Sequence, residues 1–319
     1  MKPLYLAIFS FIFIASCSLA IMKVNSVRGV TVRHISQKAE AKNYPPIPIL
    51  STTAGTIGLT ARSVVARDLD SGVTLFEKNP NLELFPASTT KMITALTAFD
   101  YYPLDRTIKV GKVTVPGQKM GLKEGEEMTV KNLILGLLIY SANDAAEVLA
   151  ENYCVDTSQS FVDGSLAEAG SCGREYFVQA MNKKAKVLHL ENTNFVNPSG
   201  LDNQNHLTTA QDLLKIAIES MKNPFFREVV ATKEISVTSL DGNTKHKLVN
   251  LNELVGEVDG VLGIKTGWTE NAQENLVTYL ERDNKKIAIV LLGSSDRFGE
   301  TKQIIDWIFE NYEWKPVFF

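Results

Sequence analysis

The chain has 319 residues, of which 45% are hydrophobic and 22% charged, a composition that suits one large globular domain or two small ones. Its formal net charge of −3 gives no electrostatic basis for binding nucleic acid. The three cysteines and four histidines form no cluster with the spacing of metal ligands, so we expect neither a metal nor another cofactor.

The N-terminal residues are far more apolar than the rest. An almost unbroken apolar run covers residues 4–22 and is flanked by lysines. We therefore expect residues 1–22 to serve in export or membrane insertion, as a signal peptide or an anchor. Three modes stay open: a span that remains in the bilayer, cleavage near Ser18-Leu19-Ala20, or lipoprotein processing that leaves a lipidated Cys17. Each mode predicts a location outside the cytoplasm.

The next segment, residues 23–59, is predicted to be a linker. It is polar at first and then rich in proline, with the string Tyr44-Pro45-Pro46-Ile47-Pro48. Such a composition favours an extended spacer that holds a domain away from a membrane surface. Residues 60–319 are then expected to form the folded domain.

Alternating apolar and polar residues predict a β-hairpin over 62–77, with its turn at 70–72. Helical periodicity then runs from Pro86 to about residue 103. Further helices are expected over 129–140, 142–153, 175–188, 209–221 and 300–312, and strands over 107–115, 234–238, 261–266, 276–281 and 286–293. Because strands lie at both ends and helices between them, we predict an α+β fold. Its antiparallel sheet combines N- and C-terminal segments and packs against a helical lobe, with a cleft between them.

Two cysteines outside the N-terminal run, Cys154 and Cys172, flank a polar stretch. In an oxidising compartment, two such thiols suggest a disulfide that closes the loop. The alternative is two separate buried thiols.

The string Ser88-Thr89-Thr90-Lys91 places a hydroxyl and an amine one helical turn apart. A serine hydroxyl is a poor nucleophile at neutral pH and needs a base within hydrogen-bonding reach. Lys91 fits that role if burial or a second cation lowers its pKa. Ser88 would also lie at a helix start, where backbone N–H groups stabilise a developing oxyanion. The alternative, a solvated lysine on an amphipathic helix, is disfavoured by the apolar residues that flank Lys91.

Ser141-Ala142-Asn143 falls at a break between two apolar helices. Serine and asparagine at such a junction can cap unsatisfied backbone groups. A second role is compatible with capping: Ser141 can relay a proton toward a leaving amine, and Asn143 can hold Lys91 and a substrate amide. In combination with the other strings, this catalytic interpretation is favoured.

Lys265-Thr266-Gly267-Trp268 is predicted to lie on a strand edge. Because Gly267 has no side chain, a substrate peptide can dock there as an added strand. Lys265 and Thr266 offer a charge and a hydroxyl to a terminal carboxylate, and the N–H of Trp268 is a second oxyanion donor beside that of Ser88. Arg297 adds a charged fork for the carboxylate, although a surface salt bridge is the alternative.

In this order, Ser88-Thr89-Thr90-Lys91, Ser141-Ala142-Asn143 and Lys265-Thr266-Gly267 resemble the motif set of penicillin-binding proteins. The resemblance covers about residues 61–312 and includes Pro86-Ala87-Ser88 and the string from Phe195 to Asp202. It is closest to the serine-type D-Ala-D-Ala carboxypeptidases. It implies the penicillin-recognising serine transferase fold, an acyl-enzyme on Ser88 formed from peptidoglycan stem peptides, acylation of that serine by β-lactams, and residence at the outer face of the bacterial cytoplasmic membrane or in the cell wall.

Three departures from that family accompany the resemblance. The insert between Cys154 and Cys172 is longer than the usual connection, and Gln273 stands where glycine is common. The chain stops at Phe319, so we expect no C-terminal β-rich domain or C-terminal anchor, and the N-terminal run would replace that anchor.

Other activities of the same residues stay open. A D,D-endopeptidase would cut peptide cross-links with the same motifs. A β-lactamase would need a general-base glutamate, but Glu168 and Glu191 lack the usual Glu-x-x-Leu-Asn context. A β-lactam sensor would be acylated without turnover.

Overall fold

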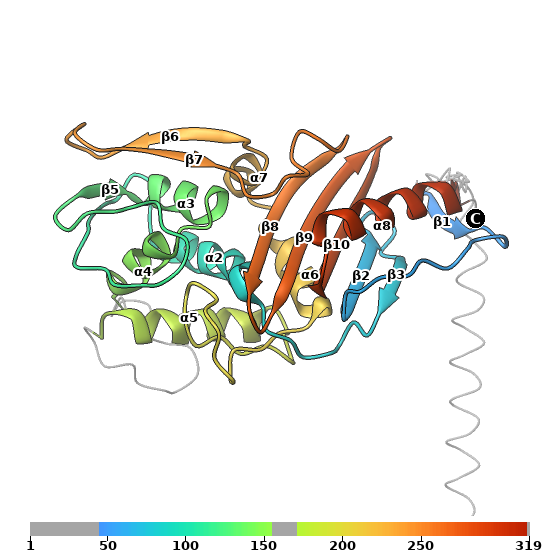
Figure 1. The fold of residues 1–319 in the computed structure, drawn as a ribbon, viewed down its shortest axis with the longest axis horizontal. Helices are drawn as coiled ribbons and strands as arrows, with labels where there is room; N and C mark the ends of the chain where they lie inside the picture. The colour runs from blue at the N-terminus through green and yellow to red at the C-terminus, as the bar shows by residue number, and fades with distance from the viewer. Residues whose placement is uncertain (1–44, 155–170, 318–319) are drawn as a thin grey trace, which may run out of the picture. The chain divides into compact units, whose positions relative to one another are not determined.

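The computed structural model describes residues 45–154 and 171–317, and the N-terminal run with Cys17 lies outside these ranges. A five-stranded antiparallel sheet, in the order β3-β2-β10-β9-β8, forms its centre (Figure 1). The strands are β2 (Ser63–Asp68), β3 (Thr74–Lys78), β8 (Val261–Thr269), β9 (Gln273–Arg282) and β10 (Lys285–Ser294). Because β2 pairs with β10, segments from both ends of the chain share one sheet, which confirms the predicted α+β fold.

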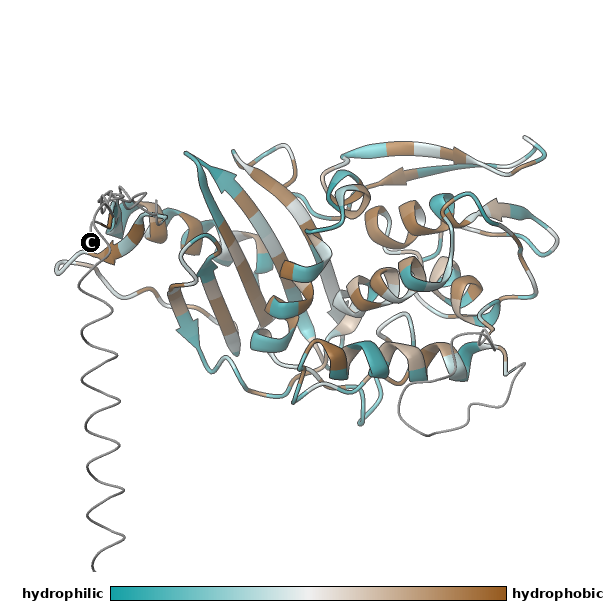
Figure 2. Ribbon diagram, turned by 180° about the vertical axis from the view of Figure 1, so that it is seen from behind, coloured by the Kyte–Doolittle hydropathy of each residue, from teal (hydrophilic) through white to brown (hydrophobic). Residues whose placement is uncertain are grey.

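Helices cover both faces of this sheet. The lobe on one face comprises η1 (Ala87–Thr90), α2 (Lys91–Tyr101), α3 (Val130–Ile139), α4 (Asn143–Glu151), α5 (Arg174–Val187), α6 (Ala210–Ser220) and α7 (Pro224–Val230). On the other face α8 (Arg297–Asn311) crosses the strands (Figure 1). Apolar residues line much of the strands (Figure 2), since both faces are buried. In the described ranges, none of the helices combines the length and the apolarity needed to cross a bilayer.

Side chains of β8 alternate between these two layers. Lys265 pairs with Val277, which belongs to the core beneath the helical lobe. Thr266 pairs with Leu276, which belongs to the core beneath α8. Lys265 and Gly267 therefore face the lobe, whereas Thr266 and Trp268 lie on the α8 face. Since β8 is an edge strand, its outer backbone edge is left for another chain segment.

Three two-stranded ribbons complete the described part. They are β1 (Ile47–Leu50) with β11 (Tyr312–Lys315), β4 (Thr107–Lys109) with β5 (Glu127–Thr129), and β6 (Glu234–Thr238) with β7 (Lys245–Val249). β1 lies within the range expected to be linker, and the domain boundary at residue 60 stays a prediction. The strand expected over 107–115 is wrong beyond Lys109, because its ribbon partner is only three residues long and Gly111 and Pro116 follow.

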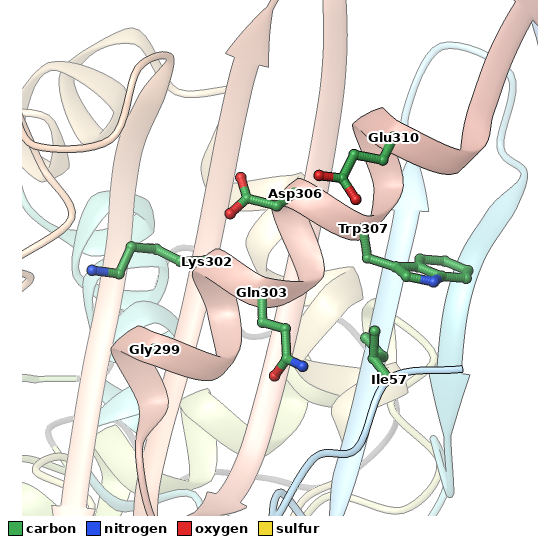
Figure 3. Close-up of a pocket in the computed structure, with 7 residues that line it drawn as sticks. All are labelled: Ile57, Gly299, Lys302, Gln303, Asp306, Trp307 and Glu310. Atoms are coloured by element: carbon green, nitrogen blue, oxygen red, sulfur yellow. The ribbon is translucent and has the colours of Figure 1, made fainter. Parts of the chain in front are cut away.

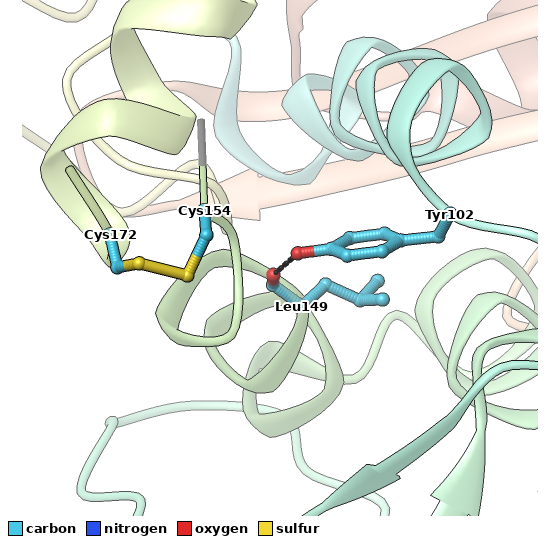
Figure 4. Close-up of a disulfide and its surroundings, with 4 residues drawn as sticks. All are labelled: Tyr102, Leu149, Cys154 and Cys172. Atoms are coloured by element: carbon cyan, nitrogen blue, oxygen red, sulfur yellow. Dashed lines mark hydrogen bonds between the residues drawn. A yellow bond between two sulfur atoms is a disulfide. The ribbon is translucent and has the colours of Figure 1, made fainter. Parts of the chain in front are cut away.

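The structure contains the expected disulfide. Cys154, just after α4, is bonded to Cys172, just before α5, with an Sγ–Sγ distance of 2.04 Å (Figure 4). Nearby, the Tyr102 hydroxyl donates a hydrogen bond of 2.8 Å to the carbonyl of Leu149 in α4. The disulfide and this bond both hold the C-terminal part of α4, one to α5 and the other to the end of α2.

Candidate active site

The turn that carries Ser88 has an unusual backbone. Ala87 has a φ of +49°, and the Thr89 hydroxyl donates to the Pro86 carbonyl at 2.7 Å. A positive φ is unfavourable for alanine, and such conformations persist where surrounding structure imposes them, often at functional sites. Here the conformation places Ser88 in a short helical turn that leads straight into α2.

Lys91 lies fully buried beside Ser88. Its Nζ donates to the Ser88 Oγ at 2.9 Å and to the Ser199 carbonyl at 2.6 Å. Burial lowers the pKa of Lys91 well below its usual value, and the positive charge of Lys265 lowers it further, whereas nearby carboxylates act in the opposite direction. A neutral amine is therefore more accessible here than on a surface, and it is positioned to take a proton from Ser88.

The loop that supplies the Ser199 carbonyl is held by Asn197. Its Oδ1 accepts hydrogen bonds from the N–H groups of Gly200 at 2.7 Å and Leu201 at 3.1 Å. Gly200 has a φ of +88°, and a Cβ there would stand 1.8 Å from the Ala87 carbonyl oxygen. A glycine is therefore required for the loop to pack against the Ser88 turn.

A buried histidine ties this loop to α2. The Val196 N–H donates to His206 Nδ1 at 3.4 Å, so Nε2 carries the proton and donates to the Thr90 hydroxyl at 3.0 Å. Burial lowers the pKa of His206 to about 4, and it is neutral at physiological pH. His206 thus supports the segment between Ser88 and Lys91 as an uncharged link.

Ser141 and Asn143 lie at the start of α4. Ser141 is buried and has a φ of +58°. Asn143 donates from Nδ2 to the Pro116 carbonyl and from its backbone N–H to the Gln118 carbonyl, both at 2.7 Å. Its Oδ1 is buried without a hydrogen-bond partner among the described atoms. The asparagine is thus fixed by the 116–118 segment and retains one free acceptor.

Two carboxylates of α4 that the sequence reasoning missed connect this motif to the rest. Asp144 accepts hydrogen bonds from the backbone N–H groups of three successive residues, 120–122. Glu147 pairs with Arg174 at 2.7 Å and accepts a longer bond of 3.4 Å from the Ser199 hydroxyl. The position of Glu147 four residues after Asn143 was an available signal, since residues i and i+4 share a helix face; Asp144, one residue after Asn143, had no such signal.

The Lys265-Thr266-Gly267 strand lies against the Ser88 turn. A Cβ at Gly267 would be 3.1 Å from the Ser88 backbone nitrogen and from the Pro86 oxygen, so the close approach suits glycine. Lys265 is buried and donates to the Thr266 carbonyl at 3.0 Å. Burial, and then the charge of Arg297, lower the pKa of Lys265 to about 7.

Arg297 reaches the same strand from the start of α8. Its Nη1 donates to the Gly267 carbonyl at 3.2 Å, and its backbone N–H donates to Glu274 at 2.8 Å. Glu274 is the cross-strand partner of Trp268, whose side chain is 62% exposed. Arg297 therefore contacts β8 through the Gly267 carbonyl, and its role toward a substrate carboxylate stays a prediction.

The predicted residues meet as three linked groups. Ser88 and Lys91 are joined by a hydrogen bond, and Gly267 and Lys265 of β8 lie beside them. Asn143 is linked to Lys91 indirectly, because Glu147 of the same helix, α4, contacts the Ser199 loop. A surface pocket between α8 and Ile57, beside Trp307, contains none of these residues (Figure 3). Among the described ranges, no group of His, Cys, Asp and Glu side chains is arranged to hold a metal ion.

Comparison with known proteins finds the same family throughout. Residues 51–296 match peptidase family S11, described as D-alanyl-D-alanine carboxypeptidase. The chain is 34% identical to D-alanyl-D-alanine carboxypeptidase DacF of Bacillus subtilis, covering 81% of this chain and 64% of that protein. It is 30% identical to the D-alanyl-D-alanine endopeptidase of Escherichia coli, covering 81% of this chain and 80% of that protein.

The crystal structure of the Streptomyces K15 DD-transpeptidase is similar, with a TM-score of 0.70, 28% identity and coverage of 80% of this chain and 99% of that one. Both the family and the fold expected from the resemblance are thus confirmed. The chain belongs to the D-alanyl-D-alanine carboxypeptidase family of serine peptidases.

Proposed function

We propose that the protein is a serine D,D-carboxypeptidase that removes the terminal D-Ala from peptidoglycan stem peptides. The observation that carries this proposal is the 2.9 Å contact between Lys91 Nζ and Ser88 Oγ, made beside the open edge of β8. The sheet edge supplies a peptide-binding surface, and the Ser–Lys pair supplies acyl transfer.

In the first half-reaction, Ser88 Oγ attacks the carbonyl of the penultimate D-Ala while Lys91 accepts the hydroxyl proton. The backbone N–H groups of Ser88 and Trp268 stabilise the negative charge on the carbonyl oxygen. The proton that Lys91 took from Ser88 passes through Ser141 to the amine of the terminal D-Ala, the C–N bond breaks, D-Ala leaves, and Lys91 is neutral again. Water then attacks the ester on Ser88, with Lys91 as base, and releases the shortened peptide.

The substrate binds as an extra strand along β8. Its terminal carboxylate is held by Lys265, Thr266 and Arg297, whose charges and hydroxyl suit an anion. The free Oδ1 of Asn143 accepts the N–H of a substrate amide. A β-lactam presents a comparable carbonyl and carboxylate, and so acylates the same Ser88.

Peptidoglycan lies outside the cytoplasm, and we place the enzyme at the outer face of the cytoplasmic membrane or in the cell wall. Residues 1–22 would bring it there as a cleaved signal, a retained anchor or a lipoprotein leader ending at Cys17.

A D,D-endopeptidase activity is the second candidate, favoured by the 30% identity to a relative of that name. The β-lactamase alternative has less support from Glu191, which is exposed, and Glu168 lies outside the described residues. Glu147, the carboxylate nearest to the Ser199 loop, is already paired with Arg174.

One experiment separates these functions. The purified protein is incubated with a pentapeptide ending in D-Ala-D-Ala, with a cross-linked peptide dimer and with a fluorescent penicillin. We expect free D-Ala from the pentapeptide and a stable penicillin adduct. Cleavage of the dimer alone would identify an endopeptidase, rapid release of hydrolysed penicillin a β-lactamase, and an adduct without peptide turnover a sensor.

Two variants test the proposed roles. Ser88→Ala should abolish penicillin labelling. Lys91→Ala should lower the acylation rate by about 10²- to 10⁴-fold while the circular dichroism spectrum is retained. Lys183→Ala, a change at an exposed helix position, is the control. Full activity of Lys91→Ala would show that another group is the base.

A further inference from the structure

We infer that Glu147 of α4 is a positioning residue for Lys91, and that Arg174 and the Cys154–Cys172 disulfide hold Glu147 in this role. Glu147 acts through its contact with Ser199 and through its charge. The inference rests on the proposed function, because the amine that it positions is the base assigned to Ser88.

Ser199 connects the two side chains. Its carbonyl accepts the 2.6 Å hydrogen bond from Lys91 Nζ, and its hydroxyl lies 3.4 Å from Glu147 Oε1 and 3.3 Å from Asn197 Oδ1. The Asn197 oxygen already accepts two backbone N–H groups, which use its two lone pairs. The single hydroxyl proton of Ser199 is therefore left for Glu147, and this bond helps to fix the residue whose carbonyl holds the amine.

Glu147 is itself held by the start of α5. Its side chain is only 8% exposed, and its second oxygen, Oε2, accepts the 2.7 Å bond from Arg174 Nε. A carboxylate buried to this extent is costly without a charged partner, so Arg174 compensates a charge that the interior would otherwise disfavour.

The disulfide sets where Arg174 lies. Arg174 follows Cys172 by two residues, and Cys172 is bonded to Cys154 just after α4 (Figure 4). The bond therefore keeps the first turn of α5 beside the end of α4, and with it the guanidinium beside Glu147. A covalent link is useful here because the side chain of Arg174 is 46% exposed, and an exposed ion pair alone is weak.

Charged groups from two elements face Lys91. Burial is the largest cause of its lowered pKa, and Lys265 on β8 lowers that pKa further, whereas Glu147 and Asp144 on α4 raise it. His206, which also lies near, is neutral at physiological pH. Loss of the charge of Glu147 should therefore lower the pKa of Lys91 still more.

The test measures the rate of acylation by a fluorescent penicillin from about pH 5 to about pH 9. On the acidic side the rate should rise with pH, as Lys91 loses its proton. Glu147→Gln keeps an oxygen for Ser199 but removes the charge, so this rise should move to lower pH by about one unit. Arg174→Gln leaves the carboxylate uncompensated, so the rise should move to higher pH. A general loss of stability would not produce shifts of opposite sign.

Three more variants complete the set. Glu147→Ala also removes the acceptor of the Ser199 hydroxyl, and should lower the maximal rate at least about tenfold relative to Glu147→Gln. Cys154→Ser with Cys172→Ser should shift the profile in the same direction as Arg174→Gln. Asp100→Asn is the matched control, because it removes a carboxylate from the 2.6 Å ion pair between α2 and α5, and it should leave the profile unchanged.

Unchanged profiles in Glu147→Gln and Arg174→Gln, or shifts of the same sign, would overturn the inference, and an unshifted double cysteine variant would remove the disulfide from it. If the wild type neither forms the penicillin adduct nor releases D-Ala, the proposed function fails instead. A ¹³C NMR titration of the Lys91 side chain, assigned with Lys91→Ala, then decides the inference by itself. Opposite pKa shifts in the two variants support it, and equal pKa values overturn it.

Discussion

At the scale of single residues, the site depends on two buried amines whose charges are costly to retain. Lys91 and Lys265 are both inaccessible to water, and both have a lowered pKa. The sequence predicted this arrangement, since a buried lysine near a second cation is what a serine base requires. It did not predict the Ser199 carbonyl as a partner of Lys91, because every residue type has a backbone carbonyl and the residue type therefore gives no signal.

Arg297→Gln tests the electrostatic link between Arg297 and Lys265. Removing the guanidinium charge should raise the pKa of Lys265 above about 7, because a neighbouring cation disfavours the protonated amine. In the wild type, carboxylate binding should weaken as pH rises through about 7 and Lys265 loses its proton. In the variant, KM at low pH should be larger than in the wild type. The further rise of KM should begin at a higher pH than in the wild type. Measurements of KM from about pH 6 to about pH 9 check this shift, and an unshifted profile would contradict it.

Lys265→Met should make the protein more stable and less active. Folding lowers the pKa of Lys265 from its ordinary 10.5 to about 7, so the folded state binds fewer protons than the unfolded state between those values. Stability from this group therefore rises with pH across that window, and the penalty for the buried charge is largest below about pH 7. Replacement by methionine should raise the free energy of unfolding there by about 1 to 4 kcal/mol, with a smaller gain at high pH. Urea titrations at two pH values measure the difference in the free energy of unfolding between variant and wild type. An equal difference at both pH values would refute the link between the pKa of Lys265 and stability.

Gln273 illustrates a departure that the structure explains. It has a φ of +58° at the start of β9, a conformation that favours glycine. Its side chain donates from Nε2 to the Glu270 carbonyl at 2.8 Å, within its own turn. Gln273 thus adopts a backbone conformation typical of glycine, and its side chain stabilises the turn that follows Trp268.

At the scale of elements, periodicity placed the long helices and the sheet strands within a few residues. The elements it missed, β5, β7, β11 and α7, have seven residues or fewer, although Asn223-Pro224 is a recognisable helix start. β1 falls in the range predicted as a linker, because that prediction followed from its proline-rich composition. Close approaches such as Gly200 against Ala87 were not predictable, since two distant segments must meet before the missing Cβ matters.

The β6–β7 hairpin is joined to the segment that holds Asn143 by a buried pair. His246 lies 2.6 Å from Glu126 through Nε2 and donates from Nδ1 to the Met120 carbonyl at 2.9 Å. We expect Glu126→Ala to lower the free energy of unfolding by about 3 to 5 kcal/mol, because it leaves a buried imidazole without its partner. Acylation by penicillin should also slow, since Pro116 and Gln118 at the other end of this segment position Asn143.

Denaturant titration and stopped-flow labelling measure both effects. The matched control is Lys247→Ala in the same hairpin, whose ion pair with Glu234 is exposed and should contribute less than about 1 kcal/mol. Equal losses in the two variants would show that burial does not distinguish the pairs.

At the scale of the whole molecule, the fold brings the turn that carries Ser88 against the edge strand β8. The sheet combines strands from both ends of the sequence, so the Ser88 turn and β8, far apart in sequence, meet. This juxtaposition exists only while the helical lobe remains folded against the sheet.

The Cys154–Cys172 disulfide closes a loop with a sequence separation of 18 residues in this lobe. In the chain-entropy treatment, a loop of this size stabilises the fold by about 3 kcal/mol. Cys154→Ser with Cys172→Ser should therefore lower the free energy of unfolding by about that amount, measured in urea. Thiol titration of the unreduced wild type should find neither Cys154 nor Cys172 reactive, and reaction at both would rule the disulfide out.

The unpaired edge of β8 has a consequence for misassembly. An open strand edge with glycine beside it can recruit any extended segment, including the same strand of a second molecule. The helical lobe, whose Ser88 turn packs against β8 at Gly267, restricts access to that edge. Conditions that loosen the lobe should therefore promote ordered self-association before they cause full unfolding, and a tightly bound β-lactam should suppress it.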